Sequence, residues 1–232
     1  MNLALIGYGK MGRMVHQAAG EYGFTVTRIL DLADNGNGAG ITRENFEGID
    51  AAIEFSTPDA VLANIKALAA LRIPAVIGTT GWTQHLEEAR AVVAACRSAL
   101  VWSPNYSIGV NVFTRLVSEA ARLLEEHAAY GAWAWEIHHS TKKDAPSGTL
   151  LKLAEAMRAA GYTRPIDVSS SRAGAHPGTH EIGFDSAADT ITLRHTARSR
   201  EGFARGALAA ARWIRGRTGF FEFSEVLFGK AD

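Results

Sequence analysis

The scarcity of cysteine already narrows the class of protein to which the chain can belong. Only one of its 232 residues is a cysteine, Cys96 in "AVVAACRSAL". A single cysteine excludes an internal disulfide framework and any zinc site built from cysteines. We read Cys96 as a small buried hydrophobic residue, which is the usual environment of a free cysteine.

Neither an excess of one charge nor a long apolar run is present. The 24 Lys and Arg residues balance the 24 Asp and Glu residues, so no global charge favours nucleic acid or an anionic membrane. No apolar run approaches the roughly 20 residues that a membrane-spanning helix needs. The start, "MNLALIGYGK", lacks the basic region of a signal peptide. We therefore expect a cytoplasmic protein that binds neither nucleic acid nor membrane.

The first part of the chain alternates short apolar runs with amphipathic helical segments. Such alternation predicts βαβ units and a parallel sheet that is covered on both faces. The expected helices lie at 13–22, 59–72 and 86–97. The expected strands lie at 2–7, 24–30, 51–56, 74–80 and 99–103.

After residue 105 the pattern changes to helices and runs of strands. Strands separated by polar turns predict a second, smaller α+β domain with an open mixed sheet. We expect 1–105 and 203–232 to form the first domain, to which the tail at 220–229 returns, and 106–202 to form the second. Helices are expected at 112–130, 150–161 and 203–216, and strands at 133–139, 166–172, 179–185 and 190–197.

Three glycines follow the first strand with the spacing G-x-G-x-x-G. Gly7 permits a tight turn, Gly9 lets the backbone approach a pyrophosphate, and Gly12 allows close contact of helix and strand. The N–H groups at the start of the helix then hold the phosphates. Asp31 ends the second strand, where this fingerprint places an acid. The motif predicts a Rossmann-like dinucleotide-binding domain.

The residues around Asp31 bear on which dinucleotide binds. Its carboxylate would accept hydrogen bonds from the adenosine ribose and repel a 2′-phosphate. The next residue is Leu32 rather than an arginine, which favours NADH over NADPH, although Arg28 or Arg43 could fold over the site.

Two further loops follow expected strands. They are "GTTG" at 78–81 and "SPNYS" at 103–107. Open α/β sheets bind ligands beyond the carboxyl ends of their strands, so both loops are candidates for cofactor contacts. Ordinary turn chemistry is the alternative for each.

The stretch "WEIHHSTKKDAPSGT" at 135–149 crowds proton carriers and cations ahead of a helix start. Strand alternation points His138 and His139 to opposite faces, so they cannot share one role: one could face a substrate while the other packs or bonds at the edge of the site. Neighbouring histidines on a strand diverge and no third ligand is evident, so we expect no metal site.

The same stretch contains a candidate anion site. Ser147 is a plausible helix N-cap, and the N–H groups of Gly148 and Thr149 would point out of the first turn. Such a turn binds a carboxylate or phosphate. With Lys142 and a histidine beside it, the turn is suited to protonating a bound dianionic substrate.

The block "EIHHSTKKDAPSGT" closely resembles the signature of the dihydrodipicolinate reductase family of lysine biosynthesis. The blocks "GKMG", "EFSTP", "VIGTTG", "SPNYSIGVN", "SRAGAHPGTHEIGF" and "LRHTARSREGFARGAL" resemble that family over nearly the whole chain. The resemblance implies a two-domain, usually tetrameric oxidoreductase. It would reduce the cyclic imine formed when hydroxytetrahydrodipicolinate loses water, using NADH or NADPH. The second domain would bind this small dicarboxylate and form the homotetramer.

The resemblance also implies roles for individual residues. His138 matches the proton donor and acceptor, and Lys142 the proton donor. His139 matches a substrate contact, and Gly148 and Thr149 match the turn that binds a substrate carboxylate. The residues matching cofactor contacts are Gly7, Tyr8, Gly9, Lys10, Met11, Gly12, Asp31, Gly78, Thr79, Thr80, Ser103, Pro104, Asn105 and Tyr106.

Three other functions compete with this one. The glycine fingerprint alone would also suit another two-domain NAD-dependent dehydrogenase of a small amino or hydroxy acid. A nucleotide-sensing protein would keep the cofactor site without turnover, and Lys142 could form a Schiff base. The combination of two histidines, a lysine and an anion-binding turn favours the reductase.

Overall fold

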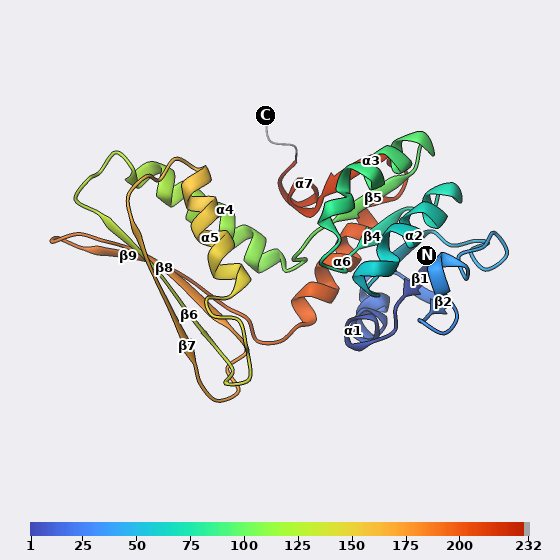
Figure 1. Ribbon diagram of the computed structural model, residues 1–232, viewed down its shortest axis with the longest axis horizontal. Coiled ribbons are helices and arrows are strands. Elements are labelled where there is room, and N and C mark those ends of the chain that lie inside the picture. The colour runs from blue at the N-terminus through green and yellow to red at the C-terminus, as the bar shows by residue number, and fades with distance from the viewer. Residues whose placement is uncertain (230–232) are drawn as a thin grey trace. The chain divides into compact units, whose positions relative to one another are not determined.

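The computed structural model describes residues 1–229, and it divides into two compact units. Unit 1 is Met1–Ile108 with Glu201–Asp232, and unit 2 is Gly109–Arg200. Figure 1 shows the two sheets, one in each unit. No helix among the described residues combines the length and the hydropathy needed to cross a membrane.

Unit 1 is built on a six-stranded sheet with the order β10-β5-β4-β3-β1-β2. Every neighbouring pair in it is parallel, so the predicted parallel sheet is confirmed. The tail returns to this unit as expected, because β10 pairs with β5. The strands are β1 (Asn2–Ile6), β2 (Thr25–Leu30), β3 (Ala51–Glu54), β4 (Ala75–Ile77), β5 (Ala99–Trp102) and β10 (Gly219–Glu222).

Helices bury both faces of this sheet. In β1, Leu3 and Leu5 pack on one side with α1 and α6, whereas Ala4 and Ile6 pack on the other with α2 and α3. Burial on both faces explains why these strands read as continuous apolar runs. The helices are α1 (Lys10–Ala18), α2 (Pro58–Ala70), α3 (Leu86–Ala95), α6 (Glu201–Ile214) and the short α7 (Phe223–Phe228).

Unit 2 has a four-stranded sheet with the order β7-β6-β8-β9. β6 pairs parallel with β7 and antiparallel with β8, so the predicted open mixed sheet is confirmed. The elements are α4 (Ile108–Leu124), whose first residue belongs to unit 1, β6 (Gly131–His138), α5 (Gly148–Ala159), β7 (Ile166–Arg172), β8 (Thr179–Asp185) and β9 (Thr190–Thr196).

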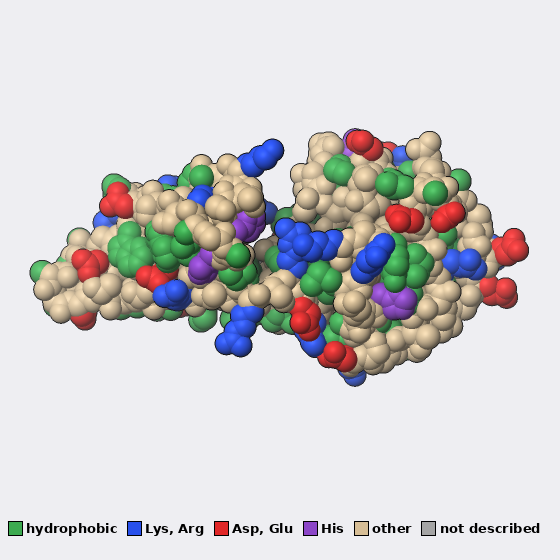
Figure 2. Space-filling view, turned by 90° about the horizontal axis from the view of Figure 1, so that it is seen from below, with side chains coloured by type: hydrophobic (Ala, Val, Ile, Leu, Met, Phe, Trp, Pro, Cys, Tyr) green, Lys and Arg blue, Asp and Glu red, His purple; other side chains and the backbone are tan. Residues whose placement is uncertain are grey.

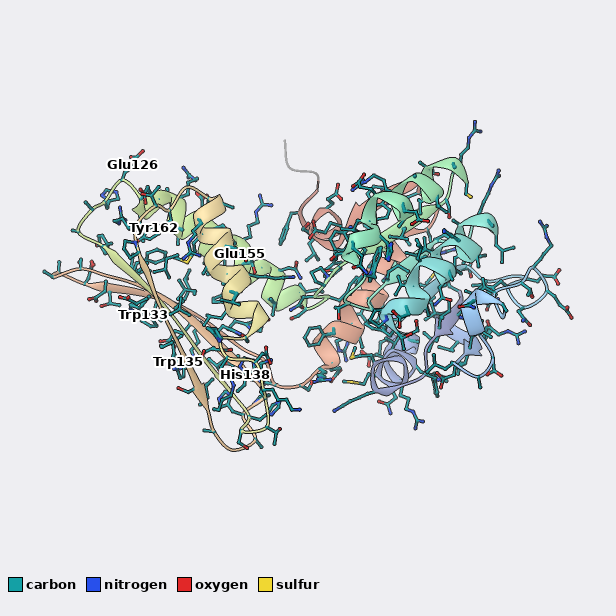
Figure 3. All side chains as sticks on the ribbon, in the orientation of Figure 1. Glu126, Trp133, Trp135, His138, Glu155 and Tyr162 are labelled. Atoms are coloured by element: carbon teal, nitrogen blue, oxygen red, sulfur yellow. The ribbon has the colours of Figure 1, made fainter. Side chains whose placement is uncertain are left out.

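One face of this second sheet packs against α4 and α5. Ala132 and Ala134 of β6 belong to the buried cluster with residues of both helices. Trp133 and Trp135 alternate with them and therefore point to the opposite face, where both remain half-buried (Figure 3). In Figure 2 the surface of this unit, on the left, carries hydrophobic side chains between charged ones.

The helix expected at 112–130 begins earlier and ends at Leu124. Arg164 explains the end, because its guanidinium donates to the carbonyl oxygens of Leu124 and Glu125 at 2.7 and 2.6 Å. A cation that satisfies the last carbonyls of a helix fits the negative end of its dipole. Periodicity alone does not reveal this cap, since Arg164 lies far along the chain.

Candidate active site

The glycine loop of unit 1 forms the cradle that the motif predicts. Gly7 has a φ of +87°, and a Cβ there would lie 2.1 Å from the carbonyl oxygen of Phe55. A Cβ at Gly12 would lie 2.2 Å from the carbonyl oxygen of Gly7, whereas nothing lies within 4 Å of one at Gly9. Close backbone contacts therefore require glycine at positions 7 and 12, and Gly9 leaves open space at the start of α1. This is the backbone that a pyrophosphate requires.

The glycine loop and the loop after β4 come together. They share a cleft of about 390 Å³ at the carboxyl ends of the strands, which is where open α/β sheets bind ligands. The lining residues are Gly9, Lys10, Met11, Phe55, Ser56, Pro58, Gly78, Thr79 and Thr80.

Asp31 lies beside the glycine loop. Its Oδ1 accepts hydrogen bonds from the backbone N–H of Leu32 at 3.0 Å and of Tyr8 at 3.4 Å. Leu32 itself is 65% exposed. Arg28 donates from Nε to the carbonyl oxygen of Asn45 at 3.0 Å, which ties its guanidinium to another loop.

The loop after β5 is held by its own side chains. The hydroxyl of Ser103 donates to the carbonyl oxygen of Asn105 at 2.8 Å and accepts from the N–H of the same residue at 3.1 Å. Pro104 is exposed, whereas Tyr106 is buried. The Tyr106 hydroxyl lies 3.0 Å from the carbonyl oxygens of Ile77 and Val101 and so fastens β4 to β5. A cofactor contact of Tyr106 would therefore involve its backbone.

A buried carboxyl group, Glu54, lies at the end of β3 and was not foreseen. Its Oε1 accepts from the N–H of Ser56 at 3.0 Å, from the hydroxyl of Ser56 and from Nδ2 of Asn64 at 3.4 Å. Burial raises the pKa of Glu54, and these uncharged donors oppose the rise only in part. Ser56 lines the cleft beside the glycine loop, so Glu54 supports the wall of that cleft from behind.

In unit 2 the structure separates the two histidines. His138, labelled in Figure 3, is the last residue of β6 and lies on the same face as the buried Glu136. His139 follows the strand, with its Nδ1 2.8 Å from the hydroxyl oxygen of Thr141. The sequence left the facing of these residues open, and the sheet places His138 toward the helix-covered side.

The predicted N-cap of α5 is confirmed. The Ser147 hydroxyl accepts from the N–H of Leu150 at 3.2 Å, and α5 begins at Gly148. Gly148 is exposed, and Thr149 is partly exposed. The first N–H groups of this helix are thus available to an anion from solvent.

Lys142 and the start of α5 already hold one carboxylate, that of Asp144. Lys142 Nζ lies 2.7 and 2.9 Å from its two oxygens. The hydrogen bond from Lys142 is the largest influence lowering the pKa of Asp144, and the backbone N–H of Gly148 lowers it further. The cation and the helix N-terminus can therefore act together on a single carboxylate.

A cluster around Glu136 was missed by sequence reasoning. Glu136 is fully buried, and its Oε1 accepts from the N–H of Ser147 at 2.8 Å, from Ser170 Oγ at 3.0 Å and from Arg172 Nη2 at 2.9 Å. Its Oε2 lies 2.7 Å from His138 Nδ1 and 3.6 Å from His180 Nε2. The available signal was a charged residue on the same strand face as Ala132 and Ala134, inside an apolar pattern.

The charge states in this cluster follow from burial and partners. Burial by itself would raise the pKa of Glu136, but the hydrogen bonds from Ser147 and Arg172 outweigh it and bring that pKa to about 2. Burial lowers the pKa of His180 to about 4, with the neighbouring His138 adding to the effect. Burial also lowers the pKa of His138, against the pull of the Glu136 charge. At neutral pH the cluster contains a charged Glu136 and a neutral His180.

Oxygen and nitrogen atoms of Glu136, His138 and His180 lie within 4.8 Å of one another, a spacing that could admit a metal ion. Two donors on one tetrahedral zinc lie about 3.4 Å apart, given bonds of about 2.1 Å. The carboxylate oxygen and His138 Nδ1 are closer, at 2.7 Å, which is the distance of direct contact. We therefore treat the three groups as a proton-linked cluster.

Both units match models of one protein family. Residues 1–106 match the model described as dihydrodipicolinate reductase, N-terminus, and residues 109–227 match the one described as dihydrodipicolinate reductase, C-terminus. The 4-hydroxy-tetrahydrodipicolinate reductase of Christiangramia forsetii is 36% identical, with 98% of each chain covered. The enzyme of the same name from Archaeoglobus fulgidus is 33% identical, with 94% of this chain and 96% of that one covered.

Solved structures agree on the fold. A dipicolinate-bound dihydrodipicolinate reductase from Paenisporosarcina sp. TG-14 superposes with a TM-score of 0.82 at 20% identity, covering 98% of this chain and 99% of that one. An amine dehydrogenase from Mycobacterium smegmatis superposes with a TM-score of 0.63 at 10% identity, covering 97% and 95%. The second likeness shows that the architecture extends to dehydrogenases with other substrates.

Proposed function

The chain belongs to the dihydrodipicolinate reductase family, and from that premise we propose how its residues divide the work of the reaction. Its activity is that of a 4-hydroxy-tetrahydrodipicolinate reductase, an NAD(P)H-dependent oxidoreductase of lysine biosynthesis. Unit 1 binds the dinucleotide through its glycine loop, Asp31, and the loops after β4 and β5. Unit 2 binds the dicarboxylate substrate.

When bound, the cofactor supplies a hydride to the conjugated imine, and the other tasks fall to side chains and backbone of this chain. The N–H groups of Gly148 and Thr149, with the Lys142 ammonium and His139, bind the substrate carboxylates. A proton must reach the atom conjugated to the carbon that accepts the hydride. His138 Nε2 and Lys142 Nζ are the atoms that bring it, and general acid help of this kind is worth about 10²–10⁴ in rate.

One observation carries this assignment. The Asp144 carboxylate is bound by Lys142 at 2.7 Å and its pKa is lowered by Lys142 and the Gly148 N–H together, so this cation and this helix start already recognise a carboxylate. The Glu136 carboxylate in turn touches both His138 and the N–H of Ser147. The proton carrier and the anion-binding turn thus share one buried support.

A coupled assay tests the function. A synthase makes hydroxytetrahydrodipicolinate from pyruvate and aspartate semialdehyde, and oxidation of NADH and NADPH is followed in parallel. We expect oxidation that depends on the synthase, and a much lower kcat in His138→Ala and Lys142→Ala, since each removes help given in the transition state. Lys143→Ala, at the exposed neighbour, is the control. Folded protein that binds NADH but oxidises neither cofactor would contradict the function, and unchanged kcat in both variants would contradict the residue roles.

We further propose that NADH is preferred over NADPH. The Asp31 carboxylate would repel a 2′-phosphate, Leu32 supplies no cation, and the Arg28 guanidinium is tied to Asn45. Asp31→Ser should weaken NADH and shift the ratio of kcat/KM values toward NADPH. An unchanged ratio would assign ribose recognition to another group, such as Arg13 beside the glycine loop.

The remaining proposals concern assembly and location. We propose a cytoplasmic homotetramer whose interface includes the sheet face that carries Trp133 and Trp135. Light scattering should give four times 24.9 kDa. Trp133→Asp should lower that mass, whereas Leu123→Asp at an exposed position of α4 should not. A monomeric wild-type protein would contradict the proposal, and fractionation of cells tests the location.

A further inference from the structure

Glu136 contacts both His138 and the start of α5, and it is a fully buried charged group of unit 2. It lies two residues before His138 on the same face of β6, and its side chain has no exposed surface. A buried carboxylate costs several kcal/mol unless it is paired and hydrogen-bonded. Burial of the Glu136 carboxylate therefore costs free energy. The contacts that offset this cost show which groups Glu136 positions.

One carboxylate oxygen is bound by three donors from different parts of the chain. Oε1 accepts from the backbone N–H of Ser147 at the start of α5, and from Ser170 and Arg172 of β7. The Arg172 guanidinium also donates to the carbonyl oxygen of Asp144. These bonds fix Glu136 relative to the turn that leads into the anion-binding helix start.

The other oxygen faces the proton carrier. Oε2 lies 2.7 Å from His138 Nδ1, an ion-pair distance, and neither atom meets the geometry of a hydrogen bond with any residue among 1–229. The ring N–H is close but not fully aligned, which is common for catalytic hydrogen bonds before substrate binds. A carboxylate beside Nδ1 keeps the proton on that nitrogen and leaves Nε2 as the exchanging atom.

The backbone at Gly178 lies close to the other ring nitrogen of His138, Nε2. A Cβ at Gly178 would lie 2.9 Å from His138 Nε2, and Gly178 has a φ of +134°. A side chain there would press on the nitrogen that must meet the substrate. One nitrogen of the ring therefore faces the Glu136 carboxylate, and any side chain at position 178 would crowd the other.

Resting on the function proposed above, we propose that Glu136 is a positioning residue. Its carboxylate holds the Nδ1–H of His138 with one oxygen and the start of α5 with the other, so that the proton carrier and the substrate carboxylate keep a fixed separation. This role requires no contact of Glu136 with substrate or cofactor.

The charged groups around His138 determine the pH dependence that follows. They are Glu136 on its own strand, Arg172 on β7, His180 on β8, and Lys142 and Asp144 in the loop before α5. Among them, Glu136 is the largest influence that raises the pKa of His138. Removing this negative charge must lower that pKa, because a nearby anion favours the protonated ring.

The first test is Glu136→Gln in the coupled assay, with Glu155→Gln at an exposed site of α5 as the matched control. We expect kcat to fall about 10- to 100-fold, with a smaller change in KM and no change in NADH affinity. The limb of the kcat–pH profile that His138 governs should move about one unit to lower pH. Glu136→Asp keeps the charge and should return the limb toward its wild-type position.

A second measurement needs only the wild-type protein. Nitrogen-15 NMR of histidine-labelled protein should show neutral His138 with its proton on Nδ1. The proton on Nε2, or a Glu136→Gln enzyme with wild-type kcat and an unmoved pH limb, would overturn the inference. If His138→Gln is inactive while Glu136→Gln is unaffected, only the role of Glu136 fails. If His138→Gln itself retains full kcat, the proposed function of His138 fails instead.

Discussion

Glu54 in unit 1 and Glu136 in unit 2 are both fully buried glutamates near the end of a strand. Burial pushes the pKa of each upward, yet the pKa of Glu54 stays raised whereas that of Glu136 falls to about 2. The groups that lower the pKa of Glu54 are the uncharged Ser56, Thr79 and Asn64, and the hydrogen bonds from Ser56 and Asn64 act on one oxygen. Glu136 also has uncharged donors, Ser147 and Ser170, but in addition it is paired with the guanidinium of Arg172.

The difference has two physical sources: fewer protein atoms surround Glu136, so burial opposes its charge less than that of Glu54, and a cation is among its donors. A buried carboxylate persists where a cation and several donors compensate for lost water, and it is penalised where only neutral donors are present. In unit 1, Glu54 lies behind the wall of a cleft, where its donors are uncharged and its pKa is raised. Unit 2 uses Glu136 to hold a histidine that changes charge, a task that needs an anion.

The largest effect on stability is expected when the cation beside Glu136, the guanidinium of Arg172, is removed. Arg172→Leu leaves Glu136 as an unpaired buried charge, which typically costs about 3–5 kcal/mol. Arg194→Leu is the matched control, since Arg194 is 56% exposed and pairs with Glu181 at 3.5 Å, and such pairs contribute about 0–1 kcal/mol. Urea unfolding measures both. Equal losses in the two variants would mean that Glu136 does not depend on Arg172.

Acid should weaken the Glu136 cluster through His180. Its folded pKa is about 4 and its ordinary value is 6.5, so the unfolded state binds the proton more tightly. Stability is complete above pH 6.5 and falls as the pH drops toward 4, by about 3 kcal/mol for this group. His180→Gln should unfold with a correspondingly smaller difference between pH 7 and pH 4. An equal acid loss in variant and wild type would show that His180 is not buried in its neutral form.

Access to Nε2 of His138 can be reduced by a substitution that leaves every charged residue in place. Gly178→Ala places a methyl group against Nε2 and should lower kcat about tenfold, equivalent to about 1.4 kcal/mol in the barrier. Gly161→Ala is the control, because Gly161 has a φ of +98°, also outside the region that L residues readily adopt, but a Cβ there meets nothing within 4 Å. If both variants lose the same activity, backbone strain rather than access to Nε2 is responsible.

The smallest effect is expected at Glu54. Because its folded pKa is raised above 4.5, its contribution to stability is present at low pH and is lost as the pH rises through that pKa. Glu54→Gln should therefore match or exceed wild-type stability at about pH 8, by up to about 1 kcal/mol, and lose this advantage at about pH 4. Destabilisation at pH 8 as large as that of Glu136→Gln would remove the contrast between the two residues.

Local patterns were sufficient to predict most of the fold, the glycine loop and the start of α5. Strand and helix order, the glycine cradle and the Ser147 cap depend on residues close in sequence, and each was foreseen. The family resemblance singled out His138 and Lys142. Strand alternation showed only that His138 and His139 differ, and the packing of α4 and α5 on one sheet face was needed to tell which is covered.

The support of the site could not be predicted, because it depends on the register between distant strands. Arg172 reaches Glu136 from 36 residues away, through the parallel pairing of β6 with β7. His180 faces Glu136 through the antiparallel pairing of β6 with β8. A single sequence shows that Glu136 interrupts an apolar strand face, but not which residues meet it there. Tyr106 shows the opposite case. The resemblance matched it to a cofactor contact, but its side chain lies in the core of unit 1.

Titration of the two glutamates by carbon-13 NMR, with Glu54→Gln and Glu136→Gln used to assign their carboxyl signals, would decide between charged and neutral states. Between about pH 4 and pH 8 the Glu136 signal should remain that of a carboxylate, in keeping with a pKa of about 2. The Glu54 signal should titrate with a midpoint above 4.5. A Glu136 signal that titrates in this range together with that of Glu54 would contradict a permanently charged support for His138.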